Sequence, residues 1–438
     1  MANPFIIPEC VRGSTQLDKD KFKTTVSIPF VKVPANMVGR LVGAAALKEL
    51  TIPTLNRIRP IVNGDSKTER LMLFNPLLIT ETSIPIIKDT IKNICDTEVT
   101  LDYKKFELTY EDFDIKRVMK ALLPDDLDFS GFTQIGHIAH CNLREELYPY
   151  KHLIGQIIMD KTKWCKTVVN KIDSINNEFR FFEMELLAGK EDYVAEVIED
   201  KNRYQMDFSK VFWNSRLGNE HKRLISKLDH NSIVFDGFAG VGPFVIPAAK
   251  KGVRKIFGND LNPESVKWMQ KNVKINRLEG DLIELSNLDA AEFFKTSMRN
   301  YLLTCKGSTD INCHVIMNLP AIAVTFLPAL KSLLHGQDQS DFQFPIFVHC
   351  YLFAKSSVDV PSTWFGEESQ RLVKQNIGID GLDFLEVYNV RNVAGRKEMY
   401  CCSFQLPADY IFANECKKRT LDNNDCVEID AKILKTSV

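Results

Sequence analysis

The sequence lacks an excess of either charge and lacks closely paired cysteines, and each absence excludes a class of protein. There are 56 basic and 57 acidic side chains, so the formal net charge is −1. Overall basicity therefore gives no argument for a nucleic-acid partner, and any RNA would have to bind local basic patches. The 11 cysteines include no CxxC pair, which argues against a zinc ribbon or a disulfide framework. We expect mostly buried free thiols and no metal site.

Long apolar runs and targeting signals are also missing. No run approaches the roughly 20 apolar residues that span a bilayer, and the longest candidate, residues 77–87, is broken by Thr, Glu, Ser and Pro. The segment Met-Ala-Asn-Pro-Phe-Ile-Ile-Pro has no basic region before an apolar stretch and lacks the Arg and Ser of a mitochondrial presequence. We therefore expect neither secretion nor a membrane partner.

The pattern of residue types changes twice along the chain, which predicts three domains within its 438 residues. Residues 1–130 mix helix-like stretches with loops and scattered Lys and Arg. Residues 131–207 read as a small α/β module. From residue 208 to residue 438, short apolar strands alternate with helices, a pattern that predicts a parallel, doubly wound Rossmann-like sheet.

Local patterns predict individual elements in each part. Residues 37–50 and 84–96 look helical in the first part. In the second, residues 132–140 alternate like one strand, and residues 179–187 and 193–199 flank a turn, which predicts a hairpin. Strands of the third part are expected at residues 232–235, 255–258, 282–286 and 314–317.

A glycine loop, Asp236-Gly-Phe-Ala-Gly240-Val-Gly242-Pro243, follows the first strand of the third part. Glycines at such a turn let the backbone approach a ligand closely. A dinucleotide site would want a third glycine, but Val245 stands there. S-adenosylmethionine has no phosphate to place at the helix terminus, so the loop favours that cofactor over NAD. A glycine turn without a ligand and an NAD-dependent oxidoreductase are the alternatives.

Two acidic residues after later strands support the same cofactor. Asp260 lies 18 residues beyond Gly242, near the spacing of about 20 at which a carboxylate accepts hydrogen bonds from ribose hydroxyls. Asp289 follows the next strand and is placed to accept a hydrogen bond from an adenine amino group, although it is equally a candidate helix N-cap.

A possible catalytic set lies near the same edge of the sheet. Asn318-Leu319-Pro320 ends another predicted strand and resembles the Asn/Asp-Pro-Pro loop of methyltransferases that modify nitrogen atoms; an Asx-turn is the alternative. A ring nitrogen that bears hydrogen also needs a base. Glu220 or His221, just before the first strand, could serve, unless this charged helix face is simply solvated.

Several motifs in order give a specific resemblance. The chain resembles the archaeal and eukaryotic tRNA (guanine-37-N1)-methyltransferase family, whose catalytic domain is a Rossmann-like class I methyltransferase, over roughly residues 130–405. The matching runs are His137–Arg144, Ile154–Asp160, Phe181–Gly189, Ser215–His221, the glycine loop, Met317–Pro320 and Val390–Ala394.

The resemblance implies a role for each matching residue. Glu220 would be the general base for the guanine N1 proton, Arg180 would stabilise negative charge on O6, and Asn318 and Pro320 would shape the base pocket. Cofactor contacts would come from the following residues: His221, Asp236, Gly240, Gly242, Asp260, Leu261, Asp289, Ala290 and Asn318.

The implied function is methyl transfer from S-adenosylmethionine to N1 of guanosine 37 in the tRNA anticodon loop. The resemblance also implies a monomer whose N-terminal domain contacts the tRNA body, and work in the cytoplasm and nucleus, with the mitochondrial matrix as a further compartment. Two alternatives keep the fold. One is the related wybutosine-pathway enzyme, which transfers the aminocarboxypropyl group of the same cofactor, and the other is a non-catalytic RNA-binding protein.

Overall fold

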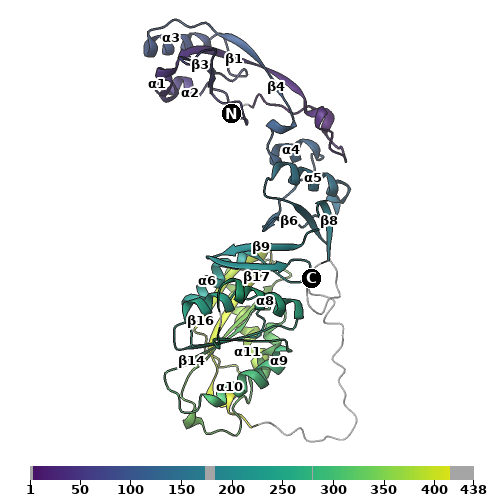
Figure 1. The fold of residues 1–438 in the computed structure, drawn as a ribbon, viewed down its shortest axis with the longest axis vertical. Helices are drawn as coiled ribbons and strands as arrows, with labels where there is room; N and C mark the ends of the chain where they lie inside the picture. Colours follow the sequence, from purple (N-terminus) through teal and green to yellow (C-terminus); the bar gives the residue numbers. More distant parts are fainter. Residues whose placement is uncertain (1–2, 173–182, 279, 415–438) are drawn as a thin grey trace. The chain divides into compact units, whose positions relative to one another are not determined.

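The computed structural model describes residues 3–172, 183–278 and 280–414. The chain forms two compact units, Met1–Val197 with Asp207–Ser209, and Ile198–Met206 with Lys210–Val438, and Figure 1 follows the chain through both. Among the described residues, none of the helices combines the length and apolar character that crossing a bilayer requires. The domain boundaries expected at residues 130 and 207 stay a prediction.

The first sheet of the first unit is antiparallel, with the order β2-β3-β1-β4. Its strands and helices are β1 (Thr24–Pro34), β2 (Ile61–Asn63), β3 (Glu69–Leu73), β4 (Asp102–Leu108), α1 (Val38–Gly43), α2 (Ala45–Lys48) and α3 (Ser83–Cys95). Ile87 and Ile91, one helical turn apart on α3, pack against Val31 of β1. The helix expected over residues 37–50 is divided, because the backbone is extended at Ala44.

The second sheet of this unit has the order β5-β6-β7-β8. Its elements are β5 (Thr133–Ile135), β6 (Ile138–Cys141), β7 (Thr167–Ile172), β8 (Glu183–Gly189), α4 (Ile115–Leu122) and α5 (Lys151–Lys161). The single strand predicted over residues 132–140 is wrong: the chain reverses at Gly136, which has a φ of 57°, and β5 pairs with β6.

The hairpin predicted between residues 179–187 and 193–199 is also wrong. The described part of the first segment, β8, pairs with β7, and β9 (Val194–Glu199) pairs instead with β10 (Asn202–Asp207). Backbone contacts explain the difference, because the Lys190 N–H donates to the Lys166 carbonyl oxygen. The turn after β8 is therefore bonded to the segment before β7.

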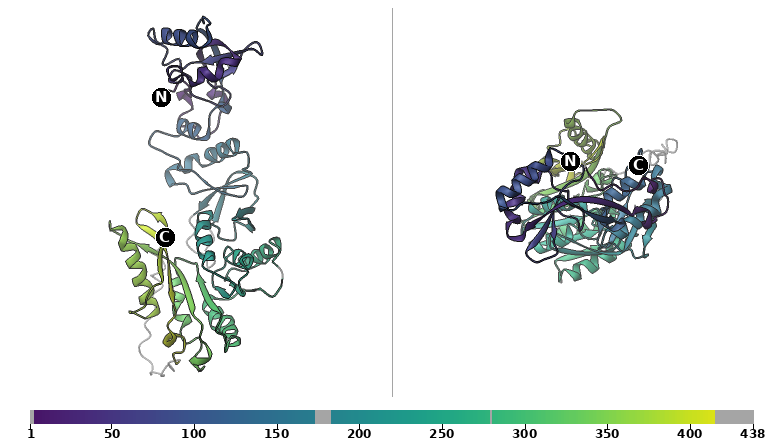
Figure 2. Two further views of the ribbon diagram at one scale, coloured as in Figure 1. Left: turned by 90° about the vertical axis from the view of Figure 1, so that its left-hand side faces the viewer. Right: turned by 90° about the horizontal axis from the view of Figure 1, so that it is seen from above.

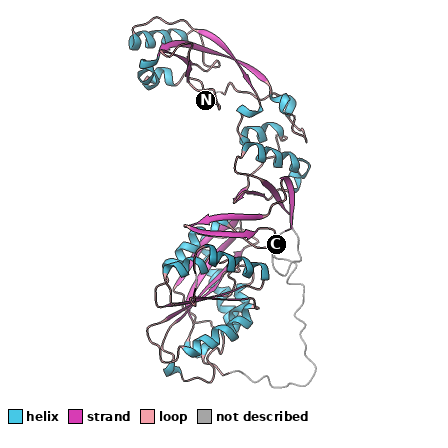
Figure 3. Ribbon diagram, in the orientation of Figure 1, coloured by secondary structure: helices cyan, strands magenta, loops and turns pink. Residues whose placement is uncertain are grey.

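The second unit contains a seven-stranded sheet of order β13-β12-β11-β14-β15-β17-β16, whose strands are coloured magenta in Figure 3. Its strands are β11 (Ser232–Asp236), β12 (Lys255–Asn259), β13 (Ile283–Ser286), β14 (Asn312–Met317), β15 (Ile346–Lys355), β16 (Glu386–Ala394) and β17 (Lys397–Gln405). Strands β11 to β15 are parallel, and β17 is antiparallel to β15 and β16. The predicted Rossmann-like class is confirmed.

Helices lie on both faces of this sheet, as the turned view in Figure 2 shows. They are α6 (Gly218–Ser226), α7 (Val245–Lys251), α8 (Pro263–Ile275), α9 (Ala290–Phe293), α10 (Arg299–Thr304), α11 (Ser362–Ile377) and α12 (Ala408–Ile411). Successive residues of a strand point to opposite faces. Val234 accordingly packs with Leu224 of α6, whereas Phe235 packs with Leu302 of α10.

Short helical turns complete the chain. They are η1 (Glu9–Val11), η2 (Lys19–Phe22), η3 (Ala35–Met37), η4 (Tyr110–Asp112), η5 (Glu145–Tyr150), η6 (Ser215–Leu217), the π-helical η7 (Phe294–Met298), η8 (Ala323–Leu330) and η9 (Gln339–Asp341).

The strand order reverses direction between β11 and β14. In open α/β sheets ligands bind outside the carboxyl ends of the strands at such a switch point, so this edge is where a site is expected.

Candidate active site

The glycine loop lies directly after β11, at the switch point. Gly240 and Gly242 have φ values of 55° and 96°, a region that side chains with a Cβ rarely adopt. A Cβ on Gly242 would lie 3.3 Å from Ile246 and Met269, whereas one on Gly240 would meet nothing within 4 Å. Gly242 therefore serves the packing of the loop, and Gly240 borders open space that a ligand can enter.

Asp236, the last residue of β11, is 0% exposed. Its Oδ1 accepts a hydrogen bond from the Phe238 N–H at 3.2 Å, but its buried Oδ2 has no partner among the described residues. Burial raises the pKa of this carboxyl to about 8. Buried polar atoms are normally hydrogen-bonded, so the orphaned oxygen indicates a ligand that brings a donor.

Asp260 follows β12 and braces the glycine loop. Its Oδ2 accepts from the Gly240 N–H at 2.8 Å, and its Oδ1 accepts from the Asn262 N–H at 2.9 Å. Burial raises the pKa of Asp260. The Ser265 side chain donates a third hydrogen bond to it, and a carboxylate has about four acceptor positions, so one remains for a ribose hydroxyl. The neighbouring Leu261 is exposed and presents an apolar surface beside that position.

Asp289 occupies the N-cap of α9. Its Oδ1 accepts from the backbone N–H groups of Ala291 at 2.8 Å and Glu292 at 3.4 Å, as the N-cap alternative predicted, while Ala290 beside it is buried. Asp289 can be both the N-cap of α9 and an acceptor for the adenine amino group, because capping uses only one of its oxygen atoms. Its contact with adenine stays a prediction.

Sequence reasoning missed Asn259, the last residue of β12. Its fully buried side-chain amide donates to the carbonyl oxygens of Gly237 and Leu288. Its Oδ1 accepts from the Ser286 hydroxyl and the Leu288 N–H, at 2.8 and 2.9 Å. Asn259 thus joins the segments that follow β11, β12 and β13. The adjacent Asp260 marked the position, but nothing in the sequence distinguished a structural amide.

Asn318 and Pro320 follow β14, the strand beside β11. The register pairs Asp236 with Ile316, two residues before Asn318. The Asn318 Oδ1 is buried and, within the described chain, has no hydrogen-bond partner, while the Pro320 carbonyl oxygen accepts from the Phe353 N–H. Two orphaned acceptors, Asp236 and Asn318, therefore lie at adjacent strand ends. S-adenosylmethionine offers amino and hydroxyl donors, so the residues present fit this cofactor.

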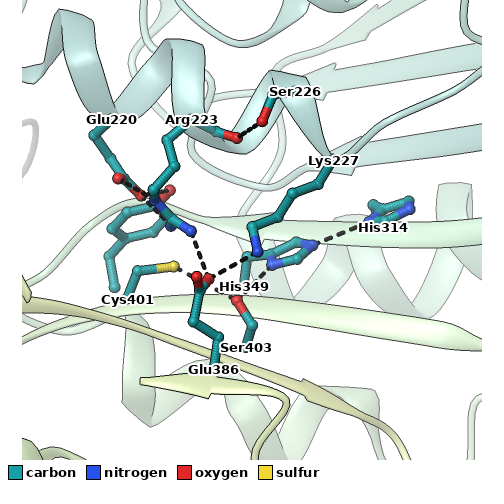
Figure 4. Close-up of polar contacts among 10 residues, drawn as sticks. Glu220, Arg223, Ser226, Lys227, His314, His349, Glu386, Cys401 and Ser403 are labelled. Atoms are coloured by element: carbon teal, nitrogen blue, oxygen red, sulfur yellow. Dashed lines mark hydrogen bonds and ion pairs between the residues drawn. The ribbon is translucent and has the colours of Figure 1, made fainter. Parts of the chain in front are cut away.

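Glu220 and His221 lie on α6, and both are buried, so the solvated-face alternative is wrong. The Glu220 carboxylate accepts two hydrogen bonds from Arg223, each 2.6 Å long, as Figure 4 shows. It also accepts one from the Tyr351 hydroxyl at 2.7 Å. The His221 Nδ1 lies 2.7 Å from a carboxylate oxygen of Glu199.

Aromatic contacts place this helix against the cofactor loop. The His221 ring meets the Phe244 ring edge to face, with 4.8 Å between centroids, and Phe244 directly follows the glycine loop. The Phe244 and Tyr351 rings are 6.1 Å apart. Glu220 and the predicted cofactor site therefore share neighbouring side chains. Arg180 lies outside the described residues, so its role in stabilising negative charge on the guanine O6 stays a prediction.

Residues 195–360 match the family model described as the TRM5/TYW2 methyltransferase domain, and residues 115–192 match the TYW2 N-terminal domain. The human tRNA (guanine(37)-N(1))-methyltransferase is 39% identical over 94% of this chain and 80% of its own length. The enzymes of that name from Danio rerio and Caenorhabditis elegans are 40% and 37% identical, over 96% and 93% of this chain and 87% and 91% of their own.

The chain belongs to the tRNA (guanine(37)-N(1))-methyltransferase family. The sequence-based assignment of the family, and with it an S-adenosylmethionine-dependent methyltransferase, is confirmed. Solved structures agree on the fold: a complex of aTrm5 with tRNALeu has a TM-score of 0.61 at 21% identity, covering 86% of this chain and 99% of that one. Trm5b from Pyrococcus abyssi has a TM-score of 0.58 at 23% identity, covering 86% and 98%.

Proposed function

We propose that this chain transfers the methyl group of S-adenosylmethionine to N1 of guanosine 37 in tRNA, with Glu220 as general base. The observation that carries the proposal is a buried carboxylate, 4% exposed, beside the aromatic residues that flank the glycine loop. Full-length relatives named for this reaction support the substrate. Bound S-adenosylmethionine supplies an electrophilic methyl group on a positively charged sulfur.

The residues of the chain have distinct tasks in this reaction. Asn318 offers an orphaned acceptor to the donors of the cofactor, as does Asp236 in its ionised form, and Asp260 offers its remaining acceptor position to the ribose. His221, Asp289, Ala290 and Leu261 complete the proposed contacts. Asn318 and Pro320, at the end of β14, also border the place where an extruded base would lie. Arg180 is proposed to stabilise charge on the guanine O6.

Glu220 performs the proton transfer. As guanine N1 forms its bond to the methyl carbon, the N1–H bond breaks and the proton passes to the carboxylate of Glu220. The electron pair of the methyl–sulfur bond stays with sulfur, so the products are methylated guanine, S-adenosylhomocysteine and a protonated Glu220. The burial of Glu220 keeps water from competing for that carboxylate.

We also propose that tRNA contacts the first unit as well as the site. A protein of the same fold was solved in complex with tRNALeu, and Lys and Arg side chains are spread through residues 1–130. Because the net charge is −1, the protein as a whole does not attract the phosphates of RNA. The tRNA must therefore bind local groups of Lys and Arg. The complex is expected to contain one copy of the chain.

The test is methyl transfer from labelled S-adenosylmethionine to tRNA transcripts that carry guanosine or adenosine at position 37. Only the guanosine transcript should be labelled. In single-turnover assays Glu220→Gln should lower the rate about 100-fold or more and leave the Kd for the cofactor nearly unchanged. Glu367→Gln, at an exposed position of α11, is the matched control. A wild-type rate for Glu220→Gln would remove the general-base role.

The alternative function, transfer of the aminocarboxypropyl group of the same cofactor, has one specific observation in its favour. Residues 115–192 match the model of the TYW2 N-terminal domain, and the wybutosine-pathway enzyme of that kind transfers the aminocarboxypropyl group. Mass spectrometry of the nucleosides after the reaction separates the two functions. We expect the mass gain of one methyl group, and the gain of an aminocarboxypropyl group would replace our proposal with the alternative.

A further inference from the structure

The carboxylate of Glu220 is held by more donors than its burial alone requires. Its Oε1 accepts from the Arg223 Nη2 at 2.6 Å and from the Tyr351 hydroxyl at 2.7 Å. Its Oε2 accepts only from the Arg223 Nε, at 2.6 Å. Each carboxylate oxygen has two lone pairs. Within the part of the chain that the structure describes, Oε1 is therefore saturated and Oε2 keeps one lone pair.

We propose that Arg223 and Tyr351 are positioning residues for Glu220, and that together they leave the second lone pair of Oε2 as the acceptor of the guanine N1 proton. This inference rests on the proposed function. A carboxylate free to rotate would present either oxygen in many directions. One fixed by three hydrogen bonds presents a single acceptor, so the N1–H of a bound guanine meets the base in one defined orientation.

Arg223 is itself prevented from moving. Its Nη1 lies 2.5 Å from a carboxylate oxygen of Glu386 on β16, which also binds the Nζ of Lys227 at 2.9 Å; Figure 4 shows both contacts. The Arg223 guanidinium lies over the Tyr388 ring, 4.1 Å from its centroid. A planar guanidinium can bridge two carboxylates in this way, whereas a lysine ammonium cannot.

Tyr351 supplies the third fixed donor from a different element. It lies in the middle of β15, fully buried, and directly opposite Cys401 of β17. Burial raises the pKa of its phenol well above the usual range. Tyr351 therefore stays a neutral donor during the reaction and gives up no proton to Glu220. Its task is orientation, and the task of Glu220 is the chemistry.

The cleanest test is Tyr351→Phe, which removes one hydroxyl and keeps the ring. A hydrogen bond to a charged group is worth about 1.5–3 kcal/mol, so we expect the single-turnover methyl-transfer rate on guanosine-37 tRNA to fall at least about tenfold. The KM for tRNA and the Kd for S-adenosylmethionine should stay within twofold. Tyr410→Phe is the matched control: its hydroxyl also lies in the second unit but donates to the Leu327 carbonyl oxygen, and its rate should be unchanged.

A double-mutant cycle with Glu220→Gln separates positioning from general structure. Because Tyr351 acts through Glu220, Tyr351→Phe should change the rate less than about twofold once Glu220 is Gln. A tenfold loss that persists in the Glu220→Gln background overturns the inference, as does a wild-type rate for Tyr351→Phe while Glu220→Gln is slow. A fast Glu220→Gln enzyme would instead refute the proposed function.

Arg223→Lys provides a second route if the phenylalanine variant folds poorly. The ammonium keeps the positive charge beside Glu220 but cannot bridge both of its oxygens. As for Tyr351→Phe, we expect a lower kcat and a nearly unchanged KM. In the Glu220→Gln background, Arg223→Lys should again have little further effect. Wild-type kcat in Arg223→Lys would show that charge alone suffices and would overturn the role of bidentate positioning.

Discussion

Single residues of the glycine loop serve either the stability of the fold or the proposed binding of the cofactor. Asp236 is a buried carboxyl with one oxygen that has no hydrogen-bond partner among the described residues. This arrangement costs stability in the free protein and is compensated when a donor arrives. Gly240 leaves space open, whereas a Cβ at Gly242 would lie only 3.3 Å from the side chains of Ile246 and Met269. Each of these residues can be tested by a substitution that affects one property and spares another.

The raised pKa of Asp236 predicts a pH-dependent stability. The native carboxyl has a pKa of about 8, against 3.8 as the ordinary value, so between these values the folded state holds a proton that the unfolded state has lost. This contribution to the free energy of unfolding is therefore fully present below about pH 4 and is lost as the pH rises through 8. Asp236→Asn should remove this contribution and make the free energy of unfolding fall less between pH 5 and 8, as urea unfolding of both proteins at pH 5, 6.5 and 8 will show. Parallel curves for the two proteins would contradict the prediction.

The two loop glycines should respond differently to a methyl group. Gly242→Ala combines an unfavourable backbone conformation with contacts at 3.3 Å, so we expect a loss of about 1–3 kcal/mol in the free energy of unfolding. Gly240→Ala meets no neighbour and should cost less stability, but its methyl group would occupy space proposed for the cofactor. Calorimetric titration should therefore show weaker S-adenosylmethionine binding in Gly240→Ala, and unchanged affinity would argue against this placement.

At the scale of elements, a row of polar side chains lies within β14, β15 and β17. The Nδ1 of His314 lies 3.0 Å from the Nε2 of His349, whose Nδ1 lies 2.8 Å from the Ser403 hydroxyl; Figure 4 includes all three residues. The His314 and His349 rings are stacked nearly parallel. Burial lowers the pKa of His314 to about 4 and that of His349 well below its usual value.

This histidine pair predicts sensitivity of the second unit to mild acid. Both rings are neutral when folded but take up protons near pH 6.5 when unfolded, so their contribution to stability is present above pH 6.5 and is lost as the pH falls towards 4. His349→Gln should flatten the dependence of the free energy of unfolding on pH in this window. Circular dichroism melts between pH 4.5 and 7.5 provide the measurement, and an unchanged slope would refute the assignment.

At the scale of the whole molecule, the proposed cofactor site belongs to one of the two compact units. Binding to the folded state alone stabilises it, by about 2.7 kcal/mol at a ligand concentration 100 times Kd. Hydrogen exchange of the full chain should therefore slow on addition of S-adenosylmethionine in the segments after β11, β12 and β14. Strands β1 to β4 of the first unit should exchange as before. Protection concentrated in those strands instead would place the cofactor elsewhere.

The fold class of the second unit, and the place of the glycine loop after its first strand, could be predicted from the sequence alone. Alternating strands and helices, and the glycines after Asp236, are local patterns whose meaning depends on nearby residues only. The same reasoning failed at residues 132–140 and at the turn after Gly189. At residues 132–140 the alternating pattern did not reveal a local turn at Gly136. After Gly189 the pairing depends on a distant backbone group, the Lys166 carbonyl oxygen, and that information is not local.

The group around Glu220, the proposed general base, shows the same difference between local and distant information. Glu220 was found through a family motif, and Arg223, three residues along the same helix, could have been inferred from helical spacing. Tyr351, which is 131 positions away from Glu220 in sequence, and Glu386 on a further strand had no such signal. These side chains meet because the order of strands across the sheet, rather than distance along the chain, determines which groups share a buried space.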